Sequence, residues 1–292
     1  MKAAVTILDG GMGQELVART GAPPTGLWST QLMIDFPQAV RDVHDDFFAA
    51  GAMVATTNSY AILRDRLVER GIEDRFAALH RQAVDTARAS RDAFGCGQVA
   101  GSLGPLGWSY RPDLAPPAQE AAKLYGEMVE LQRDGVDLFI LETMAGVEQA
   151  RGGLLGCVDA GRPVWLALSV NDADGTQLRS GEPLGDIAPL IDEYRPAAVL
   201  LNCSTPEAIS AGMPIVANWG VPFGAYANGF TRISEAFLDK MSSVDALTTR
   251  TDLSPDAYAN MAEDWVRQGA TIVGGCCEVG PAHIAELARR FS

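Results

Sequence analysis

Positive charge is scarce in this chain of 292 residues. Lysine and arginine together number 23 against 37 aspartates and glutamates, which gives a formal net charge of −14 at pH 7. A nucleic-acid-binding protein normally carries a basic face, and anionic lipid surfaces attract basic segments. The charge therefore argues against nucleic acid and anionic membranes as partners, without identifying a partner.

Long hydrophobic runs are also missing. No stretch of 18 or more apolar residues exists that would cross a bilayer. The first residues turn polar at Asp9, too early for the apolar stretch of a signal peptide. Five cysteines are an odd number, and a chain of this length can bury a core without disulfides. We expect a cytoplasmic protein whose cysteines are buried filler, nucleophiles or metal ligands.

Histidine and lysine are too few, or wrongly placed, for two common kinds of barrel enzyme. The chain has three histidines, and neither a His-x-His nor a His-Glu-x-x-His spacing occurs. His44 and His80 fall in helix-patterned segments, and His283 follows Pro281, where helix packing or capping is expected. No lysine ends a predicted strand, which argues against a Schiff-base lyase or aldolase.

Short apolar segments alternate with longer helix-patterned ones along the whole chain. Pro37–Ala50 and Glu120–Arg133 place apolar residues at three- and four-residue steps and are predicted helices. The strands are nearly continuously apolar, as expected when both faces are covered. The predicted strands are Val5–Asp9, Met53–Asn58, Gln98–Ser102, Asp137–Glu142, Val164–Ser169, Ala197–Cys203, Val221–Ala227 and Ala270–Cys276.

Eight such units over 292 residues give about 36 residues per unit, which is typical of a (β/α)8 barrel. We therefore predict an α/β chain folded as a single TIM barrel over residues 1–292. A doubly wound open sheet shows the same alternation, because periodicity in one sequence does not reveal closure.

Polar residues gather where the predicted strands end. A barrel would bring these ends together on its C-terminal face, where active sites are built, and burying polar groups there is costly unless they are used. The residues at or just after the strand ends are Asp9, Asn58, Ser102, Glu142, Ser169, Asn202, Cys203, Asn228, Cys276 and Cys277.

The cysteines at the last and third-last strands carry the most information. Cys276 and Cys277 follow two glycines at the eighth strand, and Cys203 closes the sixth. Three thiolates from nearby strand ends can form three corners of a tetrahedral zinc site whose fourth corner stays open for catalysis. The alternative is that the pair is merely small and buried. Cys96 and Cys157 lack such a context and are expected to be structural.

Two other features suggest substrate contacts. The turn Asp9-Gly10-Gly11-Met12-Gly13 lacks the spacing of a nucleotide-binding loop. Its backbone N–H groups suit a small anion such as a carboxylate. Asp9 and Glu142 can both face a substrate ammonium. Trp108 and Tyr110, in the long loop after the third strand, can cover a cationic methyl donor by cation–π contact, or can simply pack.

These segments fall in the order of a known family, and the chain resembles the zinc-dependent homocysteine S-methyltransferases. The resemblance extends from Asp9 to His283, and the Asn-Cys and Gly-Gly-Cys-Cys segments are its most specific part. The matching segments are Asp9-Gly10-Gly11-Met12-Gly13, Thr57-Asn58-Ser59-Tyr60, Gly101-Ser102-Leu103-Gly104-Pro105, Glu142-Thr143, Asp174-Gly175-Thr176, Ser180-Gly181-Glu182-Pro183-Leu184, Asn202-Cys203-Ser204 and Gly274-Gly275-Cys276-Cys277.

The resemblance implies a (β/α)8 barrel that transfers a methyl group to homocysteine to give methionine. It implies zinc on Cys203, Cys276 and Cys277, with the homocysteine thiolate as fourth ligand. It also implies that the amino-acid part of homocysteine is bound by Asp9 and Glu142, with Asn58, Asn202 and the Gly10–Gly11 backbone nearby. The small-molecule partners are then homocysteine and a methyl donor, and the oligomeric state stays open.

The methyl donor is not fixed by the resemblance. Relatives that use sulfonium donors tend to have Arg after the cysteine pair and betaine-using relatives Gly, whereas this chain has Glu278. The segment Asn228-Gly229-Phe230 also departs from both groups. S-methylmethionine, S-adenosylmethionine, betaine, another onium compound and methylfolate remain open as donors. Two further alternatives are a homocysteine-binding module that works with a separate methylfolate or cobalamin partner, and a zinc- or thiol-binding barrel without catalysis.

Overall fold

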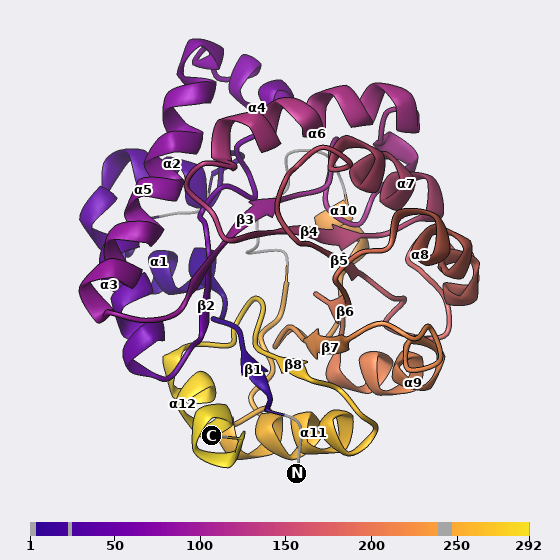
Figure 1. The fold of residues 1–292 in the computed structure, drawn as a ribbon. Helices are drawn as coiled ribbons and strands as arrows, with labels where there is room; N and C mark the ends of the chain where they lie inside the picture. Colours follow the sequence, from indigo (N-terminus) through magenta and orange to yellow (C-terminus); the bar gives the residue numbers. More distant parts are fainter. Residues whose placement is uncertain (1–3, 23–24, 239–246, 292) are drawn as a thin grey trace.

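Eight parallel strands form a barrel with helices around it (Figure 1). The structure is a computed structural model that describes residues 4–22, 25–238 and 247–291. Each strand pairs in parallel with its neighbours in the order β1-β8-β7-β6-β5-β4-β3-β2. The strands are β1 (Thr6–Ile7), β2 (Val54–Thr56), β3 (Gln98–Leu103), β4 (Leu138–Met144), β5 (Val164–Leu168), β6 (Ala198–Asn202), β7 (Phe223–Tyr226) and β8 (Ile272–Val273).

The first strand closes the sheet on itself. On one side, Thr6 of β1 pairs with Ile272 of β8. On the other side, Leu8 forms a bridge with Val54 of β2, and the Asp9 N–H donates to the Val54 carbonyl at 3.1 Å. The predicted barrel is therefore confirmed, and the open sheet is excluded.

The helices form the outer ring, except the short α10, which lies inside it over the strand ends (Figure 1). Short 3-10 turns at Glu73–Arg75, Pro112–Leu114 and Leu184–Ile187 supplement them. Within the described residues, no helix combines the length and the apolar character needed to cross a membrane. The helices are α1 (Met12–Thr20), α2 (Ser29–Asp35), α3 (Pro37–Ala49), α4 (Arg64–Val68), α5 (Phe76–Phe94), α6 (Ala118–Gln132), α7 (Val147–Gly156), α8 (Ala188–Tyr194), α9 (Pro206–Val216), α10 (Glu235–Leu238), α11 (Pro255–Arg267) and α12 (Pro281–Phe291).

All eight predicted strands exist, but several end earlier than expected. β8 ends at Val273, so Cys276 lies three residues beyond it and not at its last position. The backbone still follows the neighbouring segment, because the Cys276 N–H donates to the Ala227 carbonyl at 2.9 Å. Helix α6 begins at Ala118, two residues before the predicted start, where the Glu148 side chain accepts the Ala118 N–H at 3.2 Å.

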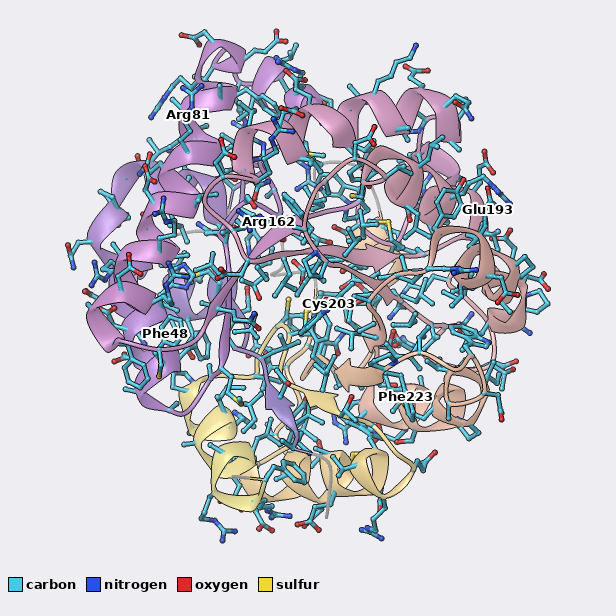
Figure 2. All side chains as sticks on the ribbon, viewed as in Figure 1. Phe48, Arg81, Arg162, Glu193, Cys203 and Phe223 are labelled. Carbon is cyan, nitrogen blue, oxygen red and sulfur yellow. A yellow bond between two sulfur atoms is a disulfide. The ribbon has the colours of Figure 1, made fainter. Side chains whose placement is uncertain are left out.

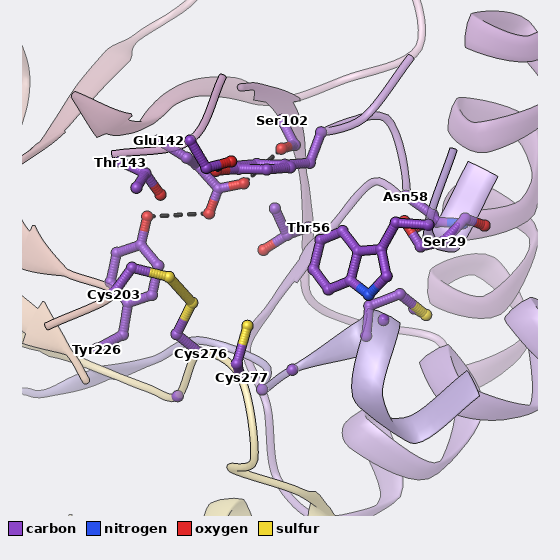
Figure 3. Close-up of a pocket in the computed structure, with 18 of the residues that line it drawn as sticks. Ser29, Thr56, Asn58, Ser102, Glu142, Thr143, Cys203, Tyr226, Cys276 and Cys277 are labelled. Atoms are coloured by element: carbon purple, nitrogen blue, oxygen red, sulfur yellow. Dashed lines mark hydrogen bonds between the residues drawn. A yellow bond between two sulfur atoms is a disulfide. The ribbon is translucent and has the colours of Figure 1, made fainter. Parts of the chain in front are cut away.

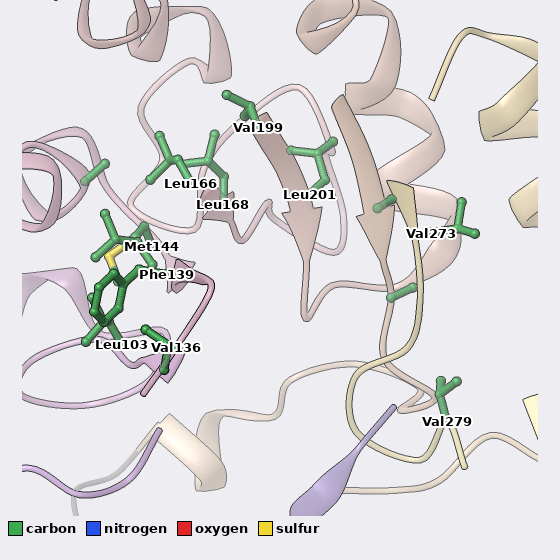
Figure 4. Close-up of a cluster of buried hydrophobic side chains, with 14 of the residues drawn as sticks. Leu103, Val136, Phe139, Met144, Leu166, Leu168, Val199, Leu201, Val273 and Val279 are labelled. Carbon is green, nitrogen blue, oxygen red and sulfur yellow. The ribbon is translucent and has the colours of Figure 1, made fainter. Parts of the chain in front are cut away.

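Strand side chains alternate between two apolar regions. In β6, Val199 and Leu201 face the helices, whereas Leu200 belongs to the interior of the barrel. Figure 4 shows the outward set, to which β5 adds Leu166 and Leu168. Since both faces of each strand are buried, the strands read as continuous apolar runs.

Cys203 lies near the middle of the barrel, away from the charged side chains at its outer edge. Figure 2 places Cys203 near the barrel axis, whereas Arg81 and Glu193 project at the outer rim. Most ion pairs between described residues are at least partly exposed, and such pairs contribute little to stability.

Candidate active site

A cavity lies at the C-terminal ends of the strands, as the barrel predicts. Figure 3 shows polar and sulfur-bearing side chains from several strand ends around it. Its polar and sulfur-bearing lining includes Asp9, Thr56, Asn58, Ser102, Glu142, Thr143, Cys203, Tyr226, Cys276 and Cys277. Ser169, Asn202 and Asn228, which were expected to share this face, lie behind the lining residues.

Three cysteine sulfurs meet at one side of the cavity. The Sγ atoms of Cys203, Cys276 and Cys277 all lie within 4.8 Å of one another. In this structure Cys203 and Cys276 are joined as a disulfide, with Cα atoms 5.8 Å apart, and Cys277 is a free thiol. Reduction of the disulfide would give three thiols close enough to share one metal ion.

Tight turns hold this sulfur cluster in place. Cys203 has a φ of 48°, in the left-handed region, directly after β6. The turn after β1 packs on the cysteine pair so closely that a Cβ on Gly11 would meet the Cys276 carbonyl oxygen at 2.6 Å. The Gly275 N–H donates to the Asp9 carbonyl at 3.0 Å. Glycine at position 11 thus lets the first and last strand ends build one site.

The environment of the free thiol favours a bound cation. Burial raises the pKa of Cys277 to about 12, with the charges of Glu278 and Glu142 adding to the effect. Without a cation this thiol stays protonated at neutral pH. A metal would supply the missing positive charge, and three sulfurs leave a fourth tetrahedral position open. The donor set therefore fits a catalytic metal.

Asp9 is buried beside the sulfur cluster. Its carboxylate accepts hydrogen bonds from the Thr56 N–H at 2.6 Å and the Thr56 hydroxyl at 2.7 Å. Burial raises the pKa of Asp9 from 3.8 to about 7, against those hydrogen bonds, and the charge of Glu142 raises it further. A ligand ammonium would stabilise the ionised form of this carboxyl group.

Glu142 is the second carboxylate of the cavity, and it is half-buried. One oxygen accepts from the Tyr226 hydroxyl at 2.9 Å, and the other accepts from the Ser102 hydroxyl. Burial raises the pKa of Glu142, while these two hydrogen bonds lower it. Two carboxylates in one cavity, with no arginine or lysine bonded to either among the described residues, suit a cationic substrate group.

The remaining predicted binding residues divide into lining and supporting ones. Asn58 lines the cavity, and its side chain donates to the Ser29 carbonyl at 3.1 Å. Gly10 and Gly11 also line it, but the Gly11 N–H already donates to Val279 at 3.0 Å. Asn202 does not reach the cavity, because both ends of its amide bond to Thr143.

Thr143, which Asn202 supports, shapes one wall of the cavity. The Thr143 N–H donates to the Asn202 carbonyl oxygen at 3.1 Å, and its hydroxyl accepts from the Asn202 amide at 3.0 Å. Thr143 has a φ of 61° at a register shift in β4. We read Asn202 as holding this irregular strand end beside Glu142.

The two loop aromatics form another wall of the cavity, and each stacks on an arginine. Trp108 has the guanidinium of Arg66 over its ring at 4.6 Å, and Tyr110 has that of Arg179 at the same distance. Tyr110 also packs against Cys203, so the aromatic wall meets the sulfur cluster there. One face of each ring is thus already covered by a cation from the chain.

Glu278, the departure that follows the cysteine pair, does not line the cavity. Its carboxylate accepts a hydrogen bond from the Gln14 side chain of α1. Gly229 makes room for it, since a Cβ there would meet the Glu278 Cβ at 2.8 Å. The residues at 229 and 278 therefore form one packing contact beneath the site.

Sequence reasoning missed several residues of this site. Tyr226 was hidden inside an apolar predicted strand, although a tyrosine near a strand end was a signal. Arg66 and Arg179 sit in loop and short-helix segments without periodicity. Arg179 pairs with Asp172, which also accepts the Thr205 N–H at 3.0 Å.

Comparison with known proteins agrees with this geometry. A family model described as homocysteine S-methyltransferase matches residues 6–291. The chain is 30% identical to the homocysteine S-methyltransferase of Escherichia coli (strain K12), over 99% of this chain and 96% of that protein.

Two solved structures share the fold over nearly their whole length. The metallated form of the homocysteine methyltransferase MmuM from Escherichia coli superposes with a TM-score of 0.82 and 28% identity, covering 99% of this chain and 97% of that one. The oxidized form of MmuM has the same TM-score with 27% identity, covering 98% and 96%.

Proposed function

Because the chain belongs to the homocysteine S-methyltransferase family and transfers a methyl group to homocysteine, giving methionine, we propose that it does so with zinc and an onium-type donor. Cys203, Cys276 and Cys277 would hold the zinc. The observation that carries this proposal is the cluster of three sulfurs within 4.8 Å, in one cavity with the buried carboxylate of Asp9 and the half-buried carboxylate of Glu142.

Zinc is the metal that the ligand set supports best. Soft thiolate ligands select zinc over magnesium or calcium, and a site with three protein ligands is typical of catalytic zinc. When bound, zinc supplies the positive charge that keeps the homocysteine thiol deprotonated at neutral pH. No general base is then required among the residues of the cavity.

The two carboxylates would hold the acceptor. Asp9 and Glu142 would bind the ammonium group of homocysteine, and the turn at Gly10–Gly11 with Asn58 would lie along its amino-acid part. This places the substrate sulfur toward the cysteine cluster and its charged end toward β1 and β4. Ammonium binding would favour the ionised state of Asp9, whose pKa burial raises to about 7.

The aromatic wall would hold the donor. The onium group, a sulfonium or a quaternary ammonium such as those of S-methylmethionine, S-adenosylmethionine or betaine, would lie against Trp108 and Tyr110. The homocysteine sulfur then attacks the methyl carbon in line, the bond from carbon to the donor sulfur or nitrogen breaks, and a neutral thioether or amine leaves. Positioning of the two reactants can supply roughly 7–11 kcal/mol of the barrier.

The test is an assay of methionine formation from homocysteine with a panel of donors, under reducing conditions, with and without a chelator. We expect turnover with at least one onium compound, loss of turnover with chelator, and recovery with zinc but not magnesium. The purified reduced protein should carry about one zinc per chain.

Two outcomes would contradict the proposal. Full turnover by metal-free protein would remove zinc from the reaction. Turnover with methylfolate only, in the presence of a cobalamin protein, would support the alternative of a homocysteine-binding module with a separate partner. Since metal binding needs reduced cysteines, we also propose a reducing cytoplasm as the working compartment.

A further inference from the structure

Arg66 is a buried cation in the wall of the cavity. It belongs to the short helix α4 (Arg64–Val68), and only 7% of its surface is exposed. Its guanidinium carbon lies 4.6 Å from the centre of the Trp108 ring, and the residue lines the cavity. The arginine thus forms part of the wall that the donor is proposed to use.

This cation has no anionic partner in the described part of the chain. Arg66 forms no salt bridge there, and its buried Nε has no hydrogen-bond partner. Asp65 and Glu69 attract the charge from a distance only. Arginine stays protonated in proteins, and an unpaired buried charge is costly.

Arg179, the other arginine that stacks on a cavity aromatic, differs from Arg66 in having an ion pair and several hydrogen bonds. It stacks on Tyr110 as Arg66 stacks on Trp108, but it bonds to both oxygens of Asp172 at 3.1 and 2.9 Å. It also donates to the Ser169 hydroxyl at 2.7 Å and the Cys203 carbonyl at 3.1 Å. Residues of the chain thus provide hydrogen-bond partners for the guanidinium of Arg179, whereas Arg66 lines the cavity without such partners among the described residues.

We propose that Arg66 binds the carboxylate of the methyl donor, so that the enzyme selects zwitterionic donors with an onium group at one end and a carboxylate at the other. This rests on the proposed function, in which the donor lies against Trp108. A guanidinium binds a carboxylate through two parallel hydrogen bonds. A donor without a carboxylate would instead bring a second positive charge beside Arg66.

The donor is favoured over homocysteine as the source of this carboxylate. Asp9 and Glu142 would draw the charged end of homocysteine toward β1 and β4, where the Gly10–Gly11 turn faces the cavity. Arg66 lies with Trp108, in the segments that follow β2 and β3. Separate charges on the two walls would keep the two substrates in separate places.

The experiment compares donors that differ only in the carboxylate end. S-methylmethionine is paired with (3-aminopropyl)dimethylsulfonium, and betaine with tetramethylammonium, in wild type, Arg66→Met and Arg66→Lys. In Arg66→Met we expect the KM of the carboxylate-bearing donor to rise about 10- to 100-fold, with little change in kcat or in the homocysteine KM. Arg66→Lys should recover part of this loss, because it keeps the charge but not the planar fork.

A nearby exposed arginine, Arg70, provides the control for Arg66. Arg70→Met removes an exposed arginine just after the same helix and should leave every KM unchanged. The proposal would be overturned if wild type used each carboxylate-free compound as readily as the matching donor that has a carboxylate. A rise in the homocysteine KM alone would assign Arg66 to the acceptor, and an equal change for both members of a donor pair would make its role structural.

Failure of the proposed function gives a different pattern. If wild type uses neither the four compounds nor S-adenosylmethionine, the onium donor itself is wrong, and the role of Arg66 falls with it. Binding of dimethylglycine, the demethylated product of betaine, supplies a readout independent of turnover. Calorimetry should show it binding wild type at least about 10-fold more tightly than Arg66→Met.

Discussion

The two walls of the cavity are built from different parts of the fold and carry opposite chemistry. The strand-end wall holds three sulfurs and two carboxylates, positioned by β1, β4, β6 and the segment after β8. The loop wall holds Trp108 and Tyr110 with their stacked arginines. A negative, sulfur-rich wall suits a metal and the ammonium of the acceptor, whereas an aromatic wall with a free guanidinium suits a zwitterionic donor.

The two walls would therefore serve two different tasks, activation of the acceptor and recognition of the donor. In the proposed function, the thiol of homocysteine would be activated in the same way whatever the donor, by residues at rigid strand ends. In the proposed function, donor recognition would lie on loops and a short helix, which tolerate change without disturbing the barrel. The difference between the walls gives four tests, taken from the largest expected effect to the smallest.

The largest effect is expected on the strand-end wall, from Cys276→Ala. Loss of one of three ligands should release the metal and lower kcat by more than about 100-fold, since loss of even an indirect metal contact can cost that much. Metal content and methionine formation are the measurements. Cys157→Ala removes another buried thiol, away from the cluster, and should keep both values. Retention of full activity by Cys276→Ala would mean that this wall does not hold the metal.

An intermediate effect is expected from Glu142→Gln on the same wall. The KM of homocysteine should rise about 10- to 100-fold, because a charged hydrogen bond to its ammonium is lost, while the donor KM stays nearly constant. Steady-state kinetics with each substrate varied separates the two constants. Exposed Glu148 provides the control, Glu148→Gln. A larger change in the donor KM would place the donor on the strand-end wall.

The same variant sharpens the role of Asp9, which is then the remaining carboxylate. Burial raises the pKa of Asp9 to about 7 in the wild type, and the charge of Glu142 adds to this rise, so in Glu142→Gln Asp9 should take up a proton and lose its charge somewhat below that value. The homocysteine KM of Glu142→Gln should therefore rise as the pH is lowered from about 8 to about 6. A flat profile would show that the charge on Asp9 does not bind the substrate.

The smallest effect is expected on the loop wall, from replacing Trp108 and Tyr110 together by alanine. Cation–π contact with a desolvated onium group contributes about 1–2 kcal/mol, so the donor KM should rise about 5- to 30-fold. Homocysteine binding should hardly change. Tyr194→Ala, at the outer end of α8, is a control of similar size. Equal weakening for both substrates would mean that the aromatics only support the cavity.

The strand-end wall was predictable from the sequence, and the loop wall largely was not. Asp9, Glu142 and Cys203 each follow an apolar run, and parallel strands of a barrel end on one face. Their convergence therefore follows once eight runs are recognised. The cysteine pair was also found, although β8 proved shorter than expected.

Arg66 and Arg179 carry no such signal. Arg66 lies in a five-residue helix, and its contact with Trp108 joins segments after two different strands. Asn202 was expected to touch substrate, but its amide is used by an irregularity in β4 that periodicity does not reveal. Contacts between loops depend on chain paths in space, and those paths follow no repeating pattern.

The pairing of β1 with β8 has a consequence for folding during synthesis. Thr6 pairs with Ile272, so the barrel closes through a contact that joins residues near opposite ends of the sequence. During synthesis, strands β1 to β7 emerge before Cys276 and Cys277 exist, and such distant pairings form slowly. A nascent chain offers only Cys203 of the three sulfurs, and the complete cluster therefore appears with the closing of the ring.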